Sequence, residues 1–187
     1  MDDINNLSRE ELIKRLELLQ NENKLLKEKI SFLSNTAYHD QLTGLLNRNC
    51  LNSTEQYGAS IMIDVDNFKN INDEFGHLIG DKALEEMGQI ILDSINPGDK
   101  AIRYGGDEFL VLRESDNEEE ALEIITRIQK GIENMRLQIK VSLSFGYFVG
   151  LEHPLHESIL YADEALLYSK GSGKNQLQKF DINNMSR

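Results

Sequence analysis

A glycine pair between two strand-like runs constrains the fold of this chain more than any other feature. Residues 103–109 read Arg-Tyr-Gly-Gly-Asp-Glu-Phe, with the strand-like residues 101–104 before the glycines and the apolar run 109–112 after them. Glycine reaches positive φ without a Cβ clash, which favours tight turns between strands. The sequence therefore predicts a β-hairpin at residues 105–106 with an antiparallel strand on either side.

Two carboxylates stand at the tip of this predicted hairpin. Asp107 and Glu108 follow Gly105 and Gly106 directly, where a bare backbone lets a ligand come close. Adjacent carboxylates beside glycine favour a divalent-metal and phosphate site. The alternative is an ordinary solvated turn, because a motif this short also occurs without a function.

A second group of carboxylates lies at the end of another predicted strand. The apolar run 59–63 has the composition of a buried strand and leads into Asp64-Val65-Asp66. In a strand Asp64 and Asp66 point to the same side, and buried acids are costly unless they are paired or bind a metal. The alternative is that both acids begin an exposed loop. Carboxylates at the ends of neighbouring strands suit metal-assisted phosphoryl transfer, with Asp64 and Asp107 as the natural pair.

These segments belong to an ordered set of motifs through which the chain resembles the GGDEF family of diguanylate cyclases over about residues 38–180. The set reads Asp40-Gln41-Leu42-Thr43-Gly44-Leu45-Leu46-Asn47-Arg48, Asp64-Val65-Asp66-Asn67-Phe68-Lys69-Asn70-Ile71-Asn72-Asp73, Phe75-Gly76-His77, Gly80-Asp81, Gly105-Gly106-Asp107-Glu108-Phe109, Ser144-Phe145-Gly146, Ala162-Asp163-Glu164-Ala165-Leu166, Lys170 and Gly173-Lys174-Asn175. Leu46 stands where the family usually has proline, and Lys174 where it more often has arginine.

The resemblance implies an α+β, palm-like nucleotide-cyclase fold, a central and mostly antiparallel sheet flanked by helices. It implies an enzyme that condenses two GTP molecules into cyclic dimeric GMP and releases two pyrophosphates. In each half-reaction a ribose 3′-hydroxyl of one GTP attacks the α-phosphate of the other. The alternative is a degenerate GGDEF module that binds nucleotide or signals without cyclising it.

The resemblance also implies a role for individual residues. The Mg²⁺ (or Mn²⁺) ligands would be Asp64, the Val65 carbonyl, Asp107 and Glu108. The catalytic hairpin would comprise Gly105, Gly106, Asp107 and Glu108. The triphosphate would be held by Lys170, Lys174, Lys69 and the amides of Asn67 and Phe68, and guanine by Asn72 and Asp81.

Several of these residues have plainer alternatives. Lys170 and Lys174 fit the preference for positive charge at a helix C-terminus. Asp81 fits the N-cap of the helix that follows it, and Asn72 fits a turn.

The first 37 residues have a different pattern from the rest. Ser8 and Glu11 form a capping box that opens a helix. A heptad seam follows, with leucine at every d position and an asparagine at one a position, which favours a parallel, in-register dimer; it comprises Leu12, Leu16, Leu19, Asn23, Leu26, Ile30, Leu33 and Ala37. We expect a coiled coil in residues 1–37, a homodimer through residues 12–37, and a GGDEF domain in residues 38–187. The alternative is a single amphipathic helix that lies on its own domain.

Apolar spacing predicts the remaining elements. Helices are expected around residues 84–95, 121–135 and 159–167, and strands at 59–63, 108–113 and 139–145. We expect the sheet on one side of the domain and the helices on the other.

Charge and composition limit the partners and the compartment. The formal net charge is −12, of which residues 1–36 contribute only −1, with 6 basic and 7 acidic side chains. A surface this acidic argues against nucleic-acid binding. The chain has no apolar run of about 20 residues and no signal-peptide pattern, so we expect no membrane insertion and a cytoplasmic location.

One expected departure from the family concerns regulation. Many relatives carry an Arg-x-x-Asp motif five residues before the signature, where product binds and inhibits. Here that stretch is Asn96-Pro97-Gly98-Asp99, in which asparagine replaces the arginine. Asparagine has neither the charge nor the planar fork to hold a phosphate, so we expect no product binding there.

Overall fold

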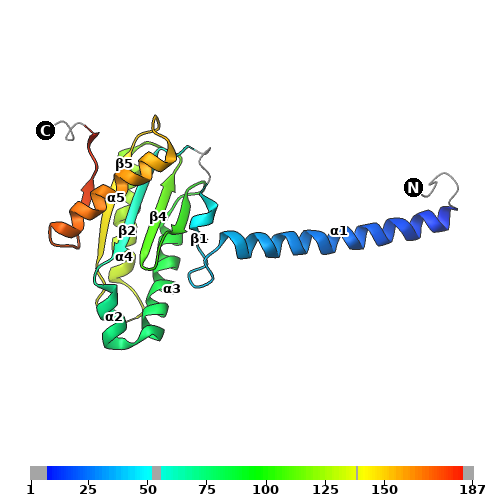
Figure 1. The fold of residues 1–187 in the computed structure, drawn as a ribbon, viewed down its shortest axis with the longest axis horizontal. Helices are drawn as coiled ribbons and strands as arrows, with labels where there is room; N and C mark the ends of the chain where they lie inside the picture. Colours follow the sequence, from blue (N-terminus) through cyan, green and yellow to red (C-terminus); the bar gives the residue numbers. More distant parts are fainter. Residues whose placement is uncertain (1–7, 52–55, 138, 183–187) are drawn as a thin grey trace. The chain divides into compact units, whose positions relative to one another are not determined.

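The computed structural model describes residues 8–51, 56–137 and 139–182. The chain divides into two compact units, Met1–Ala37 and Tyr38–Arg187. Helix α1 (Arg9–Tyr38) accounts for the described part of the first unit (Figure 1). It begins with the predicted capping box, in which the Glu11 amide donates to Ser8 Oγ at 3.3 Å and the Ser8 amide donates to Glu11 Oε2 at 2.8 Å.

The apolar seam of α1 is exposed to solvent. Each of five seam residues is at least 41% exposed, namely Leu12, Leu16, Leu19, Leu26 and Ile30. Apolar side chains at heptad spacing are buried when a second helix packs against them. The exposed seam is therefore consistent with the predicted coiled coil. Among the helices of the described ranges, none has the length and hydropathy needed to cross a bilayer.

The second unit is built on a six-stranded sheet with the order β1-β3-β4-β2-β5-β6. Its strands are β1 (Leu46–Asn47), β2 (Ala59–Val65), β3 (Lys100–Arg103), β4 (Glu108–Arg113), β5 (Leu143–Val149) and β6 (Leu177–Lys179). The central pairs β3–β4, β4–β2 and β2–β5 are antiparallel, and the outer pairs β1–β3 and β5–β6 are parallel. The predicted α+β class, the mostly antiparallel sheet and the hairpin between β3 and β4 are confirmed.

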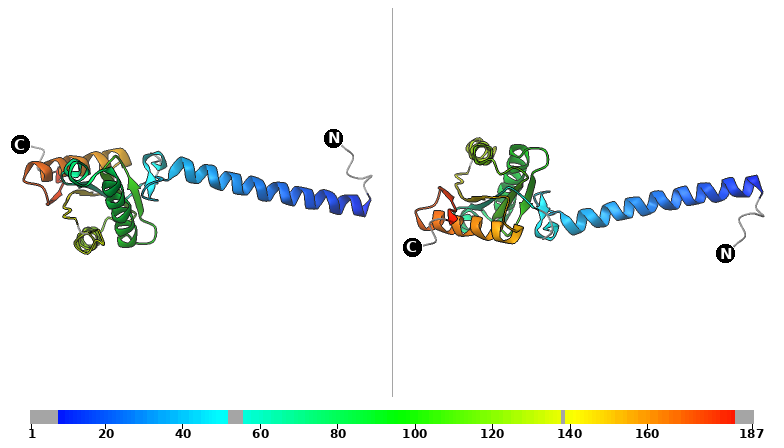
Figure 2. Two further views of the ribbon diagram at one scale, coloured as in Figure 1. Left: turned by 90° about the horizontal axis from the view of Figure 1, so that it is seen from below. Right: turned by 90° about the horizontal axis from the view of Figure 1, so that it is seen from above.

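Helices cover both faces of this sheet, so the expectation of helices on one side only is wrong. They are α2 (Phe68–Phe75), α3 (His77–Ser94), α4 (Glu118–Glu133) and α5 (Leu155–Gly171), with a short 3₁₀ helix at Arg48–Cys50. Figure 2 shows α3 and α4 on one side of the sheet and α5 on the other. β2 is buried at every position, because its alternate side chains enter two separate cores.

The two cores follow the alternation of the strands. Ile61 and Ile63 of β2 pack in the core that α3 and α4 cover, whereas Met62 packs in the core under α5. Gly146 lets α5 come close to β5, because a Cβ there would lie 2.1 Å from the Leu166 amide nitrogen. Any larger residue at that position would push α5 off the sheet.

The predicted elements differ from the observed ones mainly at their ends. The strand expected at 139–145 begins only at Leu143. Ile139 and Val141 are apolar because they pack, partly buried, against the core under α3 and α4. Ile95 and Met135, expected in helices, lie just beyond the ends of α3 and α4.

Candidate active site

Strand pairing brings the two predicted carboxylate groups to one edge of the sheet. Asp64, near the end of β2, lies opposite Glu108, the first residue of β4. The Val65 amide donates to the Asp107 carbonyl at 3.2 Å, so the tip of the hairpin is fixed to the end of β2. The predicted proximity of Asp64 to Asp107 and Glu108 follows from this register.

Backbone conformation does not require either hairpin glycine, and space requires only the first. Neither Gly105 nor Gly106 has a positive φ, so the conformational reason expected from the sequence is wrong. A Cβ at Gly105 would lie 2.5 Å from Glu108 Oε2, whereas one at Gly106 would meet nothing within 4 Å. Gly105 thus leaves room for the Glu108 carboxylate, and Gly106 leaves an open approach to the hairpin backbone.

Asp64 is a buried carboxylate with incomplete charge compensation. The residue is 7% exposed, and Lys170 Nζ lies 2.7 Å from its Oδ2. Burial raises the pKa of Asp64 above its ordinary value; Lys170 opposes that rise, and the charges of Asp107 and Glu108 add to it. Lys170 therefore compensates Asp64 while two further carboxylates add negative charge beside it, and the site favours a further cation.

The donor set fits a hard divalent cation. Carboxylate and carbonyl oxygens are the ligands that Mg²⁺ and Mn²⁺ prefer, and the Lys170 ammonium already holds a positive charge against Asp64. In the described ranges, no three His, Cys, Asp or Glu side chains converge closely enough to form a ready metal cage. Asp64, Asp107 and Glu108 share an edge of the sheet without forming such a cage.

Asp66 lies in surroundings quite unlike those of Asp64, although the sequence predicts that both point to the same side. Asp64 lies directly opposite Ser144 on β5, and the Asp66 carboxylate bonds to that same serine, so these contacts agree with the predicted same side. Its carboxylate accepts from Ser144 Oγ at 2.6 Å, from Ser142 Oγ at 2.9 Å and from the Asn175 amide at 2.9 Å. The alternative of an exposed loop is wrong, because Asp66 is 5% exposed.

The residues predicted to hold phosphate come from three elements. Lys170 lies in the last turn of α5, as the helix-end alternative expects, and its ammonium contacts Asp64. Lys174 lies just beyond α5 and donates from Nζ to Asn67 Oδ1 at 2.6 Å. α2 begins at Phe68, so Phe68 and Lys69 contribute first-turn amides that have no partner within the helix. Lys170 and Lys174 thus bring two ammonium groups to the residues around Asp64 and the start of α2.

Asn72 and Asp81 lie on neighbouring helices. Asn72 is inside α2 and not in a turn, and Asp81 is inside α3, which starts at His77 after Gly76, so it is not an N-cap. Both plain alternatives are therefore wrong. A Cβ at Gly80 would lie 2.0 Å from Asn72 Oδ1, which places the Asn72 amide against the residue before Asp81. Asp81 itself is exposed.

Arg103 is a site residue that the sequence did not single out. Its Nε and Nη2 donate to the Gly106 carbonyl at 3.1 and 2.7 Å, and its Nη1 donates to Asp40 Oδ1 at 3.0 Å. Burial acts to raise the pKa of Asp40, but hydrogen bonds from Thr43 and Arg103 outweigh it and hold that pKa below its ordinary value. Asp40 and Arg103 both lie in or beside quoted motifs, yet only the fold joins positions so far apart.

The turn before β3 is built around a buried ion pair. Asp99 Oδ2 accepts from the Asn96 amide at 3.0 Å, and Asp99 Oδ1 lies 3.5 Å from Arg113 Nε. Both charged side chains are only 4% exposed, and Arg113 also bonds to Glu120. The carboxylate of Asp99 is thus occupied within the protein.

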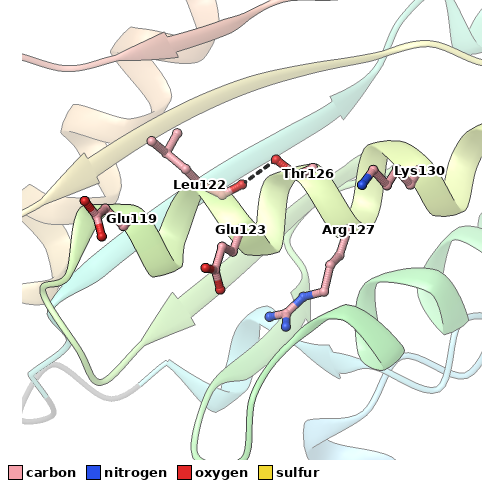
Figure 3. A pocket seen from close by; sticks show the side chains of 6 residues that line it. All are labelled: Glu119, Leu122, Glu123, Thr126, Arg127 and Lys130. Atoms are coloured by element: carbon pink, nitrogen blue, oxygen red, sulfur yellow. Dashed lines mark hydrogen bonds between the residues drawn. The ribbon is translucent and has the colours of Figure 1, made fainter.

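A shallow hollow on the outer surface of α4 offers no comparable site. Its lining comes from one helix, and Figure 3 shows the charged side chains pointing in different directions. Arg127 in that hollow donates to Asn96 Oδ1 at 3.0 Å, and the Thr126 hydroxyl donates to the Leu122 carbonyl at 2.8 Å. The site at the hairpin remains the better candidate.

Comparisons with known proteins agree with this geometry. The family model for the diguanylate cyclase GGDEF domain matches residues 37–176. Diguanylate cyclase DosC of Escherichia coli (strain K12) is 36% identical over 157 residues, which cover 74% of this chain and 34% of DosC. This chain therefore spans about a third of the length of that relative.

Two further matches are a protein named as a phosphodiesterase and a solved structure with a coiled coil. Cyclic di-GMP phosphodiesterase PdeR of Escherichia coli (strain K12) is 32% identical over 175 residues, which cover 85% of this chain and 26% of PdeR. The coiled coil and GGDEF domain of DgcB from Caulobacter crescentus, solved in complex with c-di-GMP, aligns with a TM-score of 0.77. That alignment covers 90% of this chain and 98% of the other at 23% identity, so the likeness concerns the fold.

Proposed function

This chain belongs to the GGDEF family of diguanylate cyclases, and we propose that it condenses two GTP molecules into cyclic dimeric GMP with release of two pyrophosphates. The pairing of β2 with β4 is the observation that carries the proposal. It sets Asp64 opposite Glu108 and beside Asp107, both of which lie in the intact signature hairpin. The ammonium of Lys170 contacts the Asp64 carboxylate. Neighbouring carboxylates, one of them in contact with a lysine, suit a reaction that needs cations beside a polyphosphate.

In this proposal the hairpin carboxylates and Asp64 hold Mg²⁺ or Mn²⁺, with help from the Val65 carbonyl. When bound, the metal supplies positive charge that neutralises the triphosphate during displacement at the α-phosphate. Glu108 accepts the proton of the attacking 3′-hydroxyl, and the open backbone at Gly106 lets the ribose and α-phosphate approach.

The remaining predicted residues orient the nucleotide. Lys170, Lys174 and Lys69 bind the outer phosphates together with the first amides of α2. Guanine has donors at N1 and N2 that a carboxylate accepts well, and Asp81 supplies that carboxylate next to the Asn72 amide. Asp81 is exposed, so it can meet a base that arrives from solvent.

Cyclisation needs two such sites, because each GTP is both nucleophile and electrophile. We propose that two copies of the chain associate through the seam of α1, so that two domains share one reaction across a two-fold axis. Tethering raises the local concentration of the second domain to about the millimolar range.

The degenerate alternative has some support from PdeR, whose name records a different activity. The intact signature and Asp64 favour the enzyme. To separate the two, the chain is incubated with GTP and Mg²⁺ and the nucleotides are separated by chromatography. We expect one cyclic dimeric GMP and two pyrophosphates per two GTP consumed, with no product from Asp107→Asn; binding of GTP without product by the unaltered chain would favour the degenerate module.

The dimer proposal has a matched pair of variants in α1. Leu19 and Leu26 lie on the predicted seam, whereas their neighbours Leu18 and Leu25 lie off it and are somewhat more exposed in the single chain. Replacing Leu19 and Leu26 by Asp should cost activity most at low protein concentration, because the seam is lost. The same change at Leu18 and Leu25 should cost little; equal losses from the two pairs would contradict a coiled coil in this register.

A further inference from the structure

We propose that Asp66 is a positioning residue, which anchors the turn carrying Lys174 and so directs that ammonium group toward the polyphosphate of the nucleotide. The proposal deepens the proposed function and rests on it for the identity of the nucleotide. It gives Asp66, two residues after Asp64 in the chain, a task separate from metal binding.

Both carboxylate oxygens of Asp66 accept hydrogen bonds from the protein. Oδ1 accepts from Ser144 Oγ, and Oδ2 accepts from Ser142 Oγ and from the Asn175 amide, at distances between 2.6 and 2.9 Å. The Asp66 amide in turn donates to the Ser142 carbonyl at 2.9 Å. With 5% of the residue exposed, this carboxylate is satisfied by neutral donors and is closed to solvent.

The turn that Asp66 holds is strained. Gly173, Lys174 and Asn175 have φ values of 118°, 63° and 50°, so two successive residues with side chains occupy the left-handed region. Such a conformation persists only where surrounding contacts fix it. The bond from the Asn175 amide to Asp66 is one such contact, and the bond from the Lys174 amide to the Ser169 carbonyl at 3.3 Å is another.

The anchor also fixes where the Lys174 ammonium lies. Asp66 precedes Asn67, and Lys174 precedes Asn175, so the bond from Asn175 to Asp66 brings Lys174 beside Asn67. Lys174 Nζ then donates to Asn67 Oδ1 at 2.6 Å, next to the first turn of α2. Asn67 too has a positive φ, of 57°, so both sides of this junction are held in unusual conformations. The result is an ammonium beside helix amides, a combination that suits phosphate oxygens.

The test measures nucleotide binding, so that it works even if the chain does not turn over GTP. Calorimetry compares the α,β-methylene analogue of GTP with GMP, in the full chain with Mg²⁺. If Asp66 acts through Lys174, Asp66→Asn should weaken binding of the triphosphate analogue by about tenfold, because one charge-assisted contact is lost. The affinity for GMP should be unchanged. The Mg²⁺ concentration for half-maximal triphosphate binding should also stay unchanged.

A double variant checks the route of the effect. In a Lys174→Met background, Asp66→Asn should have no further effect on triphosphate affinity, because the ammonium that it directs is gone. Asp73→Asn is the matched control, since it removes one negative charge from the same segment at an exposed position on α2, and it should leave the affinity at the wild-type value.

Asn175 gives a second pair that leaves Asp66 in place. Asn175→Gly keeps the amide and tolerates the positive φ, so it should bind like the wild type. Asn175→Pro removes the donor and cannot reach that φ, so it should reproduce the Asp66→Asn result. The proposal is overturned if Asp66→Asn lowers the affinity for GMP as much as the affinity for the triphosphate analogue, or if it shifts the Mg²⁺ concentration for half-maximal binding. It is also overturned if Asp66→Asn lowers the triphosphate affinity equally with and without Lys174.

Discussion

β3 runs between two turns that each carry glycine and an acidic residue, Asn96–Asp99 before the strand and Tyr104–Asp107 after it. In the first, the Asp99 carboxylate is buried against Arg113 and bonded to the Asn96 amide. In the second, the hairpin carboxylates add negative charge beside Asp64, which Lys170 contacts, and burial raises the pKa of Asp64. The same residue types are thus neutralised at one end of the strand and left short of positive charge at the other.

This difference separates a structural carboxylate from a binding one. A charge that already has its partners stabilises a turn and has nothing to offer a ligand. A charge that lacks compensation costs stability and gains from a cation or a substrate. Removing a carboxylate from the site should therefore raise stability and lower activity, whereas breaking the pair at the Asn96–Asp99 turn should lower stability and leave activity unchanged.

The largest effect is expected at Asp64. Asp64→Asn should reduce turnover at least about a hundredfold, since it removes a proposed metal ligand. In metal-free buffer at pH 7 it should raise the melting temperature by about 2–4 °C, the shift that 1 kcal/mol produces in a chain of this size. Calorimetric melting checks the predicted rise in melting temperature, and a product assay checks the predicted fall in turnover. A variant less stable than the wild type would contradict the claim that the Asp64 charge costs stability.

The stability gain from Asp64→Asn should depend on pH. Because the folded-state pKa of Asp64 is raised, the unfolded state loses its proton first as pH rises, and ionising Asp64 then costs the folded state stability. That cost is absent below both pKa values and complete above the folded one. The difference in melting temperature should shrink as pH falls into the acidic range.

At the other end of β3, Asp99→Ala and Arg113→Ala should each destabilise the fold by about 3–5 kcal/mol, because each leaves a buried charge without its partner. Activity per folded molecule should stay near the wild-type level. Urea unfolding measures the loss, and the double variant should cost less than the sum of the single ones. Additive losses would mean that the two charges are not coupled.

A smaller effect is expected for base selection. Asp81→Ala should narrow the preference for GTP over ATP by about tenfold, because a guanine donor loses its acceptor, a change of about 1.4 kcal/mol. Competition binding gives the ratio directly. An unchanged ratio would remove Asp81 from the guanine site, and since it caps no helix, its role would then be open.

The smallest effect is expected for product at the Asn96–Asp99 turn. Asp99 is occupied by Arg113, and Asn96 lacks the charge to hold a phosphate, so cyclic dimeric GMP should find no useful affinity there. Calorimetry with the product should give the same result for the wild type and for Asn96→Ala, which leaves the buried pair in place. Micromolar binding that is lost in Asn96→Ala or in Asp99→Asn would contradict this.

Much of the fold could be predicted because its signals are local. The hairpin was predicted from a glycine pair between two strand-like runs, although those glycines do not need positive φ, and β2 was predicted from the apolar run at 59–63. That helices cover the second face of the sheet could not be predicted from local signals. A strand buried on both faces, such as β2, has no alternation of polar and apolar residues that distinguishes one face from the other. Ile139 and Val141 alternate like a strand although they only anchor a loop to the core.

The site was predictable where motifs carry the signal and not where contacts join distant segments. Asp66 and Asp64 look alike in sequence, and only the surrounding donors from Ser142, Ser144 and Asn175 separate their roles. Arg103 likewise acquires its position from Asp40, a residue far away in the chain. Hydrogen-bond partners are set by tertiary structure, which single-sequence patterns do not encode.

Binding of Mn²⁺ tests the central claim most directly, because the account rests on carboxylates that favour a cation at one end of β3. Electron paramagnetic resonance of free Mn²⁺, in the presence of the α,β-methylene analogue of GTP, counts the ion bound by each variant. The account predicts binding by the wild type, equal binding by Asp99→Asn, and at least about tenfold weaker binding by Asp64→Asn. Equal binding by Asp64→Asn and the wild type would contradict it.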